Sequence, residues 1–394
     1  MTQRNKVKSY VSSIFISFVE WFEFLIFVYI FLQIFNNDVL SIFQKIGIIL
    51  SFIARPFGAL LFGKLSVNVG RISSLLSTVN LMIISSLLII AATYFMNNLI
   101  ICITLAITAR ILQGAAIGGE VTTSLLYIYE ISKNKATAIA FAGLGSALGM
   151  ALASYAPSIL NSMSSIQNKI YLSYGFSIIV SLLALCIRRS LIETKKEKNG
   201  IKLSFNKEYF KLGFNIFKYS FPFVFIVYYV FLVLPDYFKL KYNISSELSE
   251  QYIAYFSIFT GVAPIIFGVI ADKIGLDKVL KFTVITTILY IPLFIIVKNP
   301  LFHLNALSII MSLYFCLGFT KLFETTDIDK LYLSFPFLYN LIVAIISSQI
   351  VVLFNINIDH DYIFIFSFIL IISLYIKEII VSNKIQKGKR IYEY

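Results

Sequence analysis

Charged and amide side chains occur where long apolar runs of this chain should carry only hydrocarbon. The segment ARILQGAAIGGE, residues 109–120, places Arg110, Gln113 and Glu120 inside one such run. A charge at membrane depth costs roughly a few kcal/mol or more, so it persists mainly where it faces a protein interior or an aqueous cavity. Side chains of these types can bind a carboxylate, hold a proton or pair with one another. The segment therefore predicts a buried polar site.

Two further apolar runs carry charge at a similar depth. The segment FVEWFEF contains Glu20 and Glu23, which are three residues apart, so we expect them to share one helix face. The segment ARPFG contains Arg55, about halfway along its run. Carboxylates and guanidiniums at one depth can offset one another's burial, and a proton carrier needs such tuning. Arg55 and Arg110 can either pin helices together or bind a ligand, whereas we expect a transport role for at least one glutamate.

Small residues recur at helical spacing around these charges. Gly114 and Gly118 are four residues apart, as are Gly145 and Gly149 in the next run. This spacing lines small side chains along one face and lets a neighbouring backbone approach closely. We therefore expect these glycines to serve helix packing.

The composition is that of an integral membrane protein. Hydrophobic residues make up 59% of the 394 residues and charged residues 13%, with a mean hydropathy of +0.86. A soluble domain averages roughly 45–50% apolar and about 25% charged residues. The first apolar run is too long for a cleavable signal and shows no cleavage site, so we expect it to be retained.

Twelve apolar runs are long enough to cross a bilayer, which takes about 20 residues. They lie at approximately 10–35, 45–64, 72–96, 99–130, 136–160, 168–187, 214–238, 251–271, 279–297, 301–323, 331–354 and 360–381.

The connections predict both the orientation and a division of the chain. Most of the 33 lysines and arginines fall in connections on one side, which the positive-inside rule makes cytoplasmic, together with both termini. The net charge of +13 is explained in this way without nucleic acid. The longest polar connection separates six runs from six, so we expect two six-helix halves, 1–187 and 214–381. A cytoplasmic linker, 188–213, joins them, and a short cytoplasmic tail, 382–394, follows.

The sequence contains no recognisable catalytic or metal-binding motif. It has no HExxH, no GxSxG and no clustered Cys/His set. GALLFGKL, residues 58–65, approaches a P-loop, but Leu65 stands where Ser or Thr must bind magnesium. We therefore expect neither an enzyme nor a cofactor.

Several segments together resemble the major facilitator superfamily, and within it the metabolite:proton symporters that include proline/betaine and 2-oxoglutarate transporters. EWFEF is similar to that family's EWYDF, RILQGAAIGGE to its RxxQGxxxGGE, and RRSLIET to its RRxLxET. ARPFGALLFGKLSVNVGR resembles ARPxGxxxFGxxxDRxGR, and GVIADKIG resembles the second-half GxxxDxxG loop of the superfamily.

The resemblance implies a secondary symporter with an all-α fold of twelve transmembrane helices and a central cavity between its halves. Glu23 takes the acidic position of the first helix, and Arg110, Gln113 and Glu120 form the motif of the fourth. Two loops would act as cytoplasmic gates between conformations. Their residues are Gly63, Gly70 and Arg71 in the first loop and Gly268, Asp272 and Gly275 in the second.

Two departures from the family pattern affect the expected function. Val67 and Asn68 stand where the first loop of the family has Asp and Arg, so we expect its charge relay to be lost there, whereas Asp272 keeps the acid in the second loop. The short tail has no apolar heptads, so we expect no osmosensing coiled coil, and proline/betaine specificity does not follow automatically.

The leading hypothesis is proton-coupled uptake of a small zwitterionic or anionic metabolite across the inner membrane by a functional monomer. Arg55 or Arg110 would engage a substrate carboxylate, and Glu20 or Glu23 would carry the proton. The altered first gate favours an alternative, an uncoupled facilitator or exchanger. A transporter-derived receptor that moves nothing is the third hypothesis.

Overall fold

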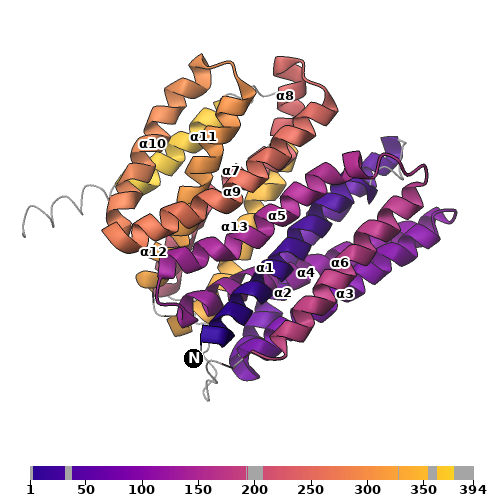
Figure 1. Cartoon of the computed structure of the whole chain (residues 1–394), viewed down its shortest axis with the longest axis horizontal. Coiled ribbons are helices and arrows are strands. Elements are labelled where there is room, and N and C mark those ends of the chain that lie inside the picture. Colours follow the sequence, from indigo (N-terminus) through magenta and orange to yellow (C-terminus); the bar gives the residue numbers. More distant parts are fainter. Residues whose placement is uncertain are drawn as a thin grey trace, which may run out of the picture.

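The computed structural model describes residues 3–31, 38–191, 193, 207–326, 328–353 and 362–376, which are overwhelmingly helical (Figure 1). The helices are α1 (Gln3–Tyr29), α2 (Asp38–Asn68), α3 (Arg71–Tyr94), α4 (Leu99–Ile131), α5 (Lys135–Ile159), α6 (Ile166–Arg188), α7 (Lys207–Leu232), α8 (Leu234–Tyr242), α9 (Ser246–Ile274), α10 (Leu276–Ile296), α11 (Pro300–Leu313), the π-helix η2 (Tyr314–Gly318), α12 (Phe319–Glu324) and α13 (Ile328–Leu353). A last apolar helix covers Tyr362–Ile376.

Ten helical segments of the described ranges are long and apolar enough to cross a membrane, by length and composition. They coincide with the first ten expected runs. The last two runs correspond to shorter apolar helices, Ser334–Ile350 within α13 and Tyr362–Ile376. The end of the first run, most of the expected linker and the whole expected tail lie outside the described residues.

One expected run is divided by the structure. Hydropathy joins residues 214–238 into a single segment, but α7 ends at Leu232 and α8 begins at Leu234. Pro235 lies in the first turn of α8, where its missing N–H does no harm. In the interior of one continuous helix the same proline would remove a hydrogen bond and clash with the preceding turn. Pro235 thus fits the start of a new helix, although six other prolines, among them Pro222 of α7, lie inside continuous helices.

The helices form two groups that lie side by side in Figure 1, with α1–α6 in one and α7–α13 in the other. The principal contacts between the groups join α5 to α9 and α2 to α13. We call the end where α1 begins, which also holds Gly70, Ser132 and Gly275, the base of the bundle. The N-terminus lies at this end in Figure 1, and α8 lies at the opposite end.

The glycines of α4 bring its backbone against that of α2, as their spacing predicts. A Cβ on Gly114 would lie 2.1 Å from the carbonyl oxygen of Ser51, and one on Gly118 would lie 2.0 Å from that of Arg55. No side chain fits at either position. The packing expectation is confirmed here and also between α5 and α1, at Gly145 and Gly149. The contact between α2 and α4 at Gly114 and Gly118, which we call the seam, fixes the position from which Arg55 projects.

The helical run Pro300–Glu324 contains a π-helical turn, η2, at Tyr314–Gly318. Such turns interrupt the regular ladder of an α-helix and occur frequently at functional sites. The hydroxyl of Tyr314 lies 3.1 Å from that of Thr287 in α10, and Phe315 is directed into the cavity described below.

Candidate substrate and proton sites

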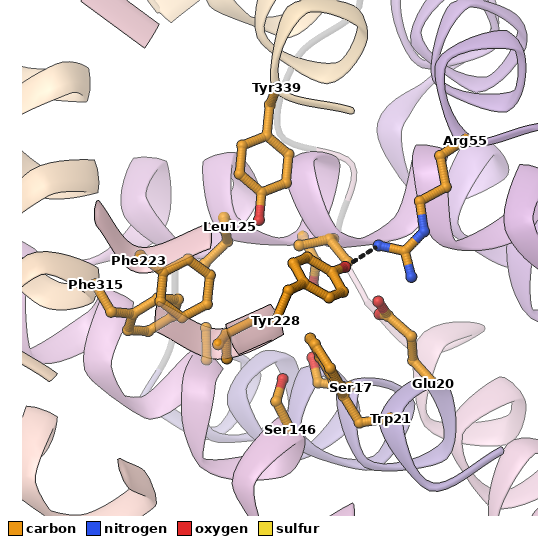
Figure 2. A pocket seen from close by; sticks show the side chains of 14 residues that line it. Ser17, Glu20, Trp21, Arg55, Leu125, Ser146, Phe223, Tyr228, Phe315 and Tyr339 are labelled. Carbon is orange, nitrogen blue, oxygen red and sulfur yellow. Dashed lines mark hydrogen bonds between the residues drawn. The ribbon is translucent and has the colours of Figure 1, made fainter. Parts of the chain in front are cut away.

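A cavity lies between the two groups of helices, halfway along α1 (Figure 2). Both groups contribute to its wall, so a ligand held there would contact both. The lining residues are Ser17, Glu20, Trp21, Arg55, Val121, Ser124, Leu125, Ala142, Ser146, Phe223, Val227, Tyr228, Phe315 and Tyr339.

Arg55 and Glu20 supply the two charges of the cavity wall. Arg55 is 4% exposed and donates from Nη1 to the hydroxyl of Tyr228 at 3.0 Å, which joins α2 to α7. Its Nε and the Oε2 of Glu20 are buried and have no hydrogen-bond partner among the described residues. Buried polar atoms are normally hydrogen-bonded, so these two are suited to a ligand or to water.

Five aromatic side chains also line the cavity, together with serines and aliphatic residues. In Figure 2 Phe223 and Phe315 lie together on the side away from Arg55 and Glu20, with Tyr228 between the two regions. The centroids of Phe223 and Phe315 are 4.8 Å apart, and those of Trp21 and Tyr228 are 6.1 Å apart. Such ring faces favour a cation or an apolar group over an anion.

Glu23 belongs to a second polar cluster, within the first group of helices. Its carboxylate, 1% exposed, accepts hydrogen bonds from Ser86 of α3 at 2.5 Å, from the Nε2 of Gln113 at 2.8 Å and from Ser177 of α6. The Oε1 of Gln113 in turn accepts from the Nη1 of Arg110. The sequence placed Glu20, Glu23, Arg55 and Arg110 at one depth, and the structure links Glu23 to Arg110 through Gln113. The sequence gave no sign of the two serines.

Arg110 is held by aromatic rings as well as by Gln113. Its guanidinium carbon lies 4.3 Å from the centroid of Phe27 and 5.3 Å from that of Phe24. Its Nε and Nη2 have no hydrogen-bond partner within the described part of the chain. Cation–π contacts offset part of the cost of burying the guanidinium.

Glu20 and Glu23 do not face the same compartment, although their spacing predicts a shared face. Three residues turn a helix by roughly 300°, so the two side chains diverge by about 60°. This divergence is enough to direct the two side chains into different spaces. Glu20 lines the central cavity, whereas Glu23 enters the space between α1, α3, α4 and α6.

Glu120 pairs with Arg188, a partner that sequence reasoning missed. Both residues are 1% exposed, and the guanidinium donates to the two carboxylate oxygens at 2.7 and 2.5 Å. The hydroxyl of Thr78 donates to the same carboxylate at 2.6 Å. The pair joins α4 to α6, Thr78 adds a contact from α3, and none of the three residues lines the cavity. Arg188 looked like a linker residue because it begins a charged stretch, yet it is the last residue of α6.

The first expected gating loop follows α2 at the base. Gly70 has a φ of +144°, a conformation that side chains rarely adopt. The carboxylate of Glu193 accepts from the backbone N–H groups of Arg71 at 2.9 Å and Ile72 at 3.0 Å. A carboxylate at the start of a helix is favoured by the helix dipole and by the free N–H groups there.

A charged contact persists at this loop in spite of Val67 and Asn68. Arg71 forms an ion pair with Glu130 at the end of α4, and its guanidinium lies 3.8 Å from the ring centroid of Tyr332. The hydroxyl of Tyr332, from α13, donates to Glu130 at 2.9 Å. The loop is thereby tied to the second group of helices through residues that the motif comparison did not identify.

The second expected gating loop is tied to the first group in a corresponding way. Asp272 accepts hydrogen bonds from the N–H groups of Ala136 at 3.1 Å and Thr137 at 2.9 Å, and from the Thr137 hydroxyl at 2.7 Å. It therefore caps the start of α5 from the end of α9. A Cβ on Gly268 would lie 2.9 Å from the Ala136 carbonyl oxygen, so the two helices are in close contact.

The chain belongs to the Major Facilitator Superfamily, whose sequence model matches residues 10–326. The fold and the comparisons below make it a multi-pass membrane protein of the transporter class rather than a member of an enzyme family.

Among curated relatives, the chain is 28% identical over 288 residues to a protein of Staphylococcus haemolyticus strain JCSC1435 named "Putative proline/betaine transporter". The match covers 66% of this chain and 61% of that protein, so the chain spans about three fifths of its relative. The alpha-ketoglutarate permease of Escherichia coli K12 is 32% identical over 121 residues, covering 29% of this chain and 28% of the permease.

Solved structures of the superfamily have the same fold. The human organic anion transporter MFSD10 (TETRAN) superimposes with a TM-score of 0.71 at 15% identity, covering 95% of this chain and 100% of that one. The proton:xylose symporter XylE gives a TM-score of 0.71 at 13% identity, covering 95% and 94% of the two chains.

Proposed function

We propose that this protein is a secondary active transporter that couples proton entry to uptake of a small zwitterionic or anionic metabolite by alternating access. The observation that carries the proposal is that the buried side chains of Arg55 and Glu20 line a cavity between the two groups of helices. The Nε of Arg55 and the Oε2 of Glu20 have no hydrogen-bond partner in the described part of the chain. The names of the relatives point to metabolites of the proline/betaine or alpha-ketoglutarate class.

Arg55 is the residue proposed to bind the substrate carboxylate. Its fork of N–H donors matches a carboxylate, and Tyr228 holds it in place through the 3.0 Å hydrogen bond. For a zwitterion, Glu20 and the ring of Trp21 would receive the positive end. For a dianion Glu20 is unfavourable unless it is protonated, so the cavity suits a zwitterion better.

Glu23 is the residue proposed to carry the proton. It is not among the residues that line the central cavity, and Gln113 links it to Arg110. Protonation of Glu23 would remove the negative charge that balances Arg110 and weaken the hydrogen bonds from Ser86 and Ser177. Since α1 carries both Glu23 and Glu20, a shift of this helix would connect the proton site to the substrate site.

The contacts at the base are proposed to close the cytoplasmic side. Arg71, Glu130 and Tyr332 would form one closing contact, and Asp272 with the start of α5 the other. Substrate would then enter from outside, and release to the cytoplasm would require both contacts to separate.

The proposal includes an arrangement in the inner membrane with twelve crossing helices and cytoplasmic termini. Residues 1–187 and 214–381 would form two six-helix halves joined by the linker 188–213, with 382–394 as a cytoplasmic tail. The lysines and arginines concentrated at one side support this orientation. The transporter would act as a monomer, with a metabolite, protons and lipid as its partners and without a nucleic acid or a cofactor.

Uptake by the purified protein in proteoliposomes tests the proposal. Labelled proline, glycine betaine and alpha-ketoglutarate are supplied with and without an inward proton gradient. We expect accumulation of one compound above its external concentration only with the gradient. No uptake of any compound, with or without the gradient, would contradict the proposed function.

An uncoupled facilitator or exchanger is the second candidate, favoured by Val67 and Asn68 in the first loop. It predicts equilibration of the substrate at the same rate with and without the gradient. Counterflow would then be unaffected by an uncoupler.

A further inference from the structure

A second space, which we call the annex, adjoins the central cavity at Phe223 and Phe315. The annex is lined by Gly143, Ala147 and Met150 of α5, Thr260 of α9 and Met311 of α11. It lies along the contact between α5 and α9, so both groups of helices form its wall. None of these five residues carries a charge.

The cavity and the annex are adjacent, because they share part of their lining. The shared residues are Trp21, Ser146, Phe223, Val227 and Phe315. In Figure 2 Phe223 and Phe315 lie on the side away from Arg55 and Glu20. A ligand bound at Arg55 would have to pass these two rings to reach the annex.

The annex offers little to a polar group. Thr260 already uses its hydroxyl proton, donating to the Ser257 carbonyl at 2.8 Å, which leaves Ser146 as the only other hydroxyl in the lining. A polar group placed among methionine, alanine and phenylalanine would lose its hydrogen bonds with water without replacement. An alkyl chain or a ring would instead be transferred favourably from water.

We propose that the substrate is an amphipathic carboxylate, with a zwitterionic or carboxylate head at Arg55 and Glu20 and an apolar tail in the annex. This inference rests on the proposed function and narrows its substrate class. Compact osmolytes would fill only the charged end of the site. Each methylene buried in the annex increases affinity by about fourfold.

Trp21 provides a direct probe, because it is the only tryptophan of the chain and lines both spaces. The protein in nanodiscs is titrated with glycine betaine and with analogues in which one N-methyl is replaced by ethyl, butyl or hexyl, while Trp21 emission is recorded. We expect Kd to fall by about fourfold per added methylene and then to level off as the annex fills. Hexanol, which lacks the head group, should give no saturable change.

A truncation in the annex distinguishes the proposal from partitioning of the ligands into lipid. Met311→Ala enlarges the annex, so the fall in Kd should continue for at least one further methylene. Ile309→Ala is the matched control, because Ile309 is on the same helix but 39% exposed. It should reproduce the wild-type series.

Two results would overturn the inference, and they can be told apart. If glycine betaine binds but Kd is unchanged or rises with tail length, the annex is no part of the site while the proposed function stands. If no carboxylate of any length changes Trp21 emission and none is taken up by proteoliposomes, the proposed function fails together with the inference.

Discussion

Arg55 and Arg110 lie in the membrane-spanning part of the chain but have different surroundings. Arg55 meets a phenol at the wall of the cavity, whereas Arg110 lies against two phenylalanine rings and an amide inside the first group of helices. A guanidinium at a cavity wall can exchange its partner for a ligand. Arg110 also has two N–H groups without a partner among the described residues, but it is not among the residues that line the cavity. The surroundings of each arginine therefore favour ligand binding by Arg55 and charge balance by Arg110.

Arg55→Lys tests this division at the level of a single side chain. Lysine keeps the charge but loses the forked donors, so we expect the KM for uptake to rise by about tenfold or more. Tyr228→Phe removes only one hydrogen bond and should raise KM by less than about tenfold. Initial uptake rates in proteoliposomes measure both. An unchanged KM in Arg55→Lys would contradict the assignment.

The Glu120–Arg188 pair is assigned to stability. Arg188→Gln leaves the Glu120 carboxylate buried without its counter-ion, which should destabilise the protein by roughly 3–5 kcal/mol. Thermal unfolding of the purified protein in detergent measures the loss. Arg189→Gln changes the neighbouring exposed arginine and should leave the midpoint unchanged. Equal midpoints in the two variants would refute a structural role for the pair.

At the scale of helices, residue spacing predicted helix packing better than it predicted which charged side chains form ion pairs. The spacing of Gly114 and Gly118 predicted that a neighbouring helix packs closely against α4, because only glycine leaves room for another backbone. That helix is α2. The hydropathy runs predicted ten membrane helices well, since length and apolarity are local properties. Arg188 was missed because its partner, Glu120, is 68 residues away, and a single sequence gives no contact of that range.

Gly118→Ala should separate α4 from α2 and displace Arg55. The new Cβ would lie 2.0 Å from the Arg55 carbonyl oxygen, so we expect a loss of about 1–3 kcal/mol in stability and a reduced rate of uptake. Gly175→Ala is the matched control, because no atom lies within 4 Å of its added Cβ. Thermal unfolding and uptake check both variants. A variant Gly118→Ala indistinguishable from Gly175→Ala would show that the seam is not tight.

Asp272→Ala should loosen the base of the bundle, since it removes the cap at the start of α5. Cys316 reports this opening, because its thiol is buried and donates to the Ala136 carbonyl at 3.2 Å. In a background lacking the other two cysteines, we expect maleimide to label Cys316 roughly fivefold faster, corresponding to about 1 kcal/mol for the cap. Asp277→Ala, at a more exposed carboxylate, should leave the rate unchanged. No acceleration in Asp272→Ala would contradict its role in closure.

For the whole molecule, the two groups of helices are joined at the base by two contacts of similar plan. Each uses the loop after a long helix, and each loop has a glycine with positive φ, Gly70 or Gly275. Gly63 and Gly70 are seven residues apart in the sequence, as are Gly268 and Gly275. The chemistry differs between them, because the second contact uses Asp272 in the last turn of α9, whereas the first uses Glu130 and Tyr332. Those two residues lie far from the motif in sequence, so their contribution could not be predicted from it.

The central claim is that substrate and proton occupy separate sites, at Arg55 with Glu20 and at Glu23. Its most direct test compares wild-type protein with Glu23→Gln in proteoliposomes, measuring gradient-driven accumulation and counterflow of the same substrate. We expect Glu23→Gln to abolish accumulation while counterflow continues, since the substrate site remains intact and only the proton carrier is lost. Glu20→Gln, in contrast, should weaken substrate binding in both measurements. Accumulation by Glu23→Gln at the wild-type level would contradict the claim.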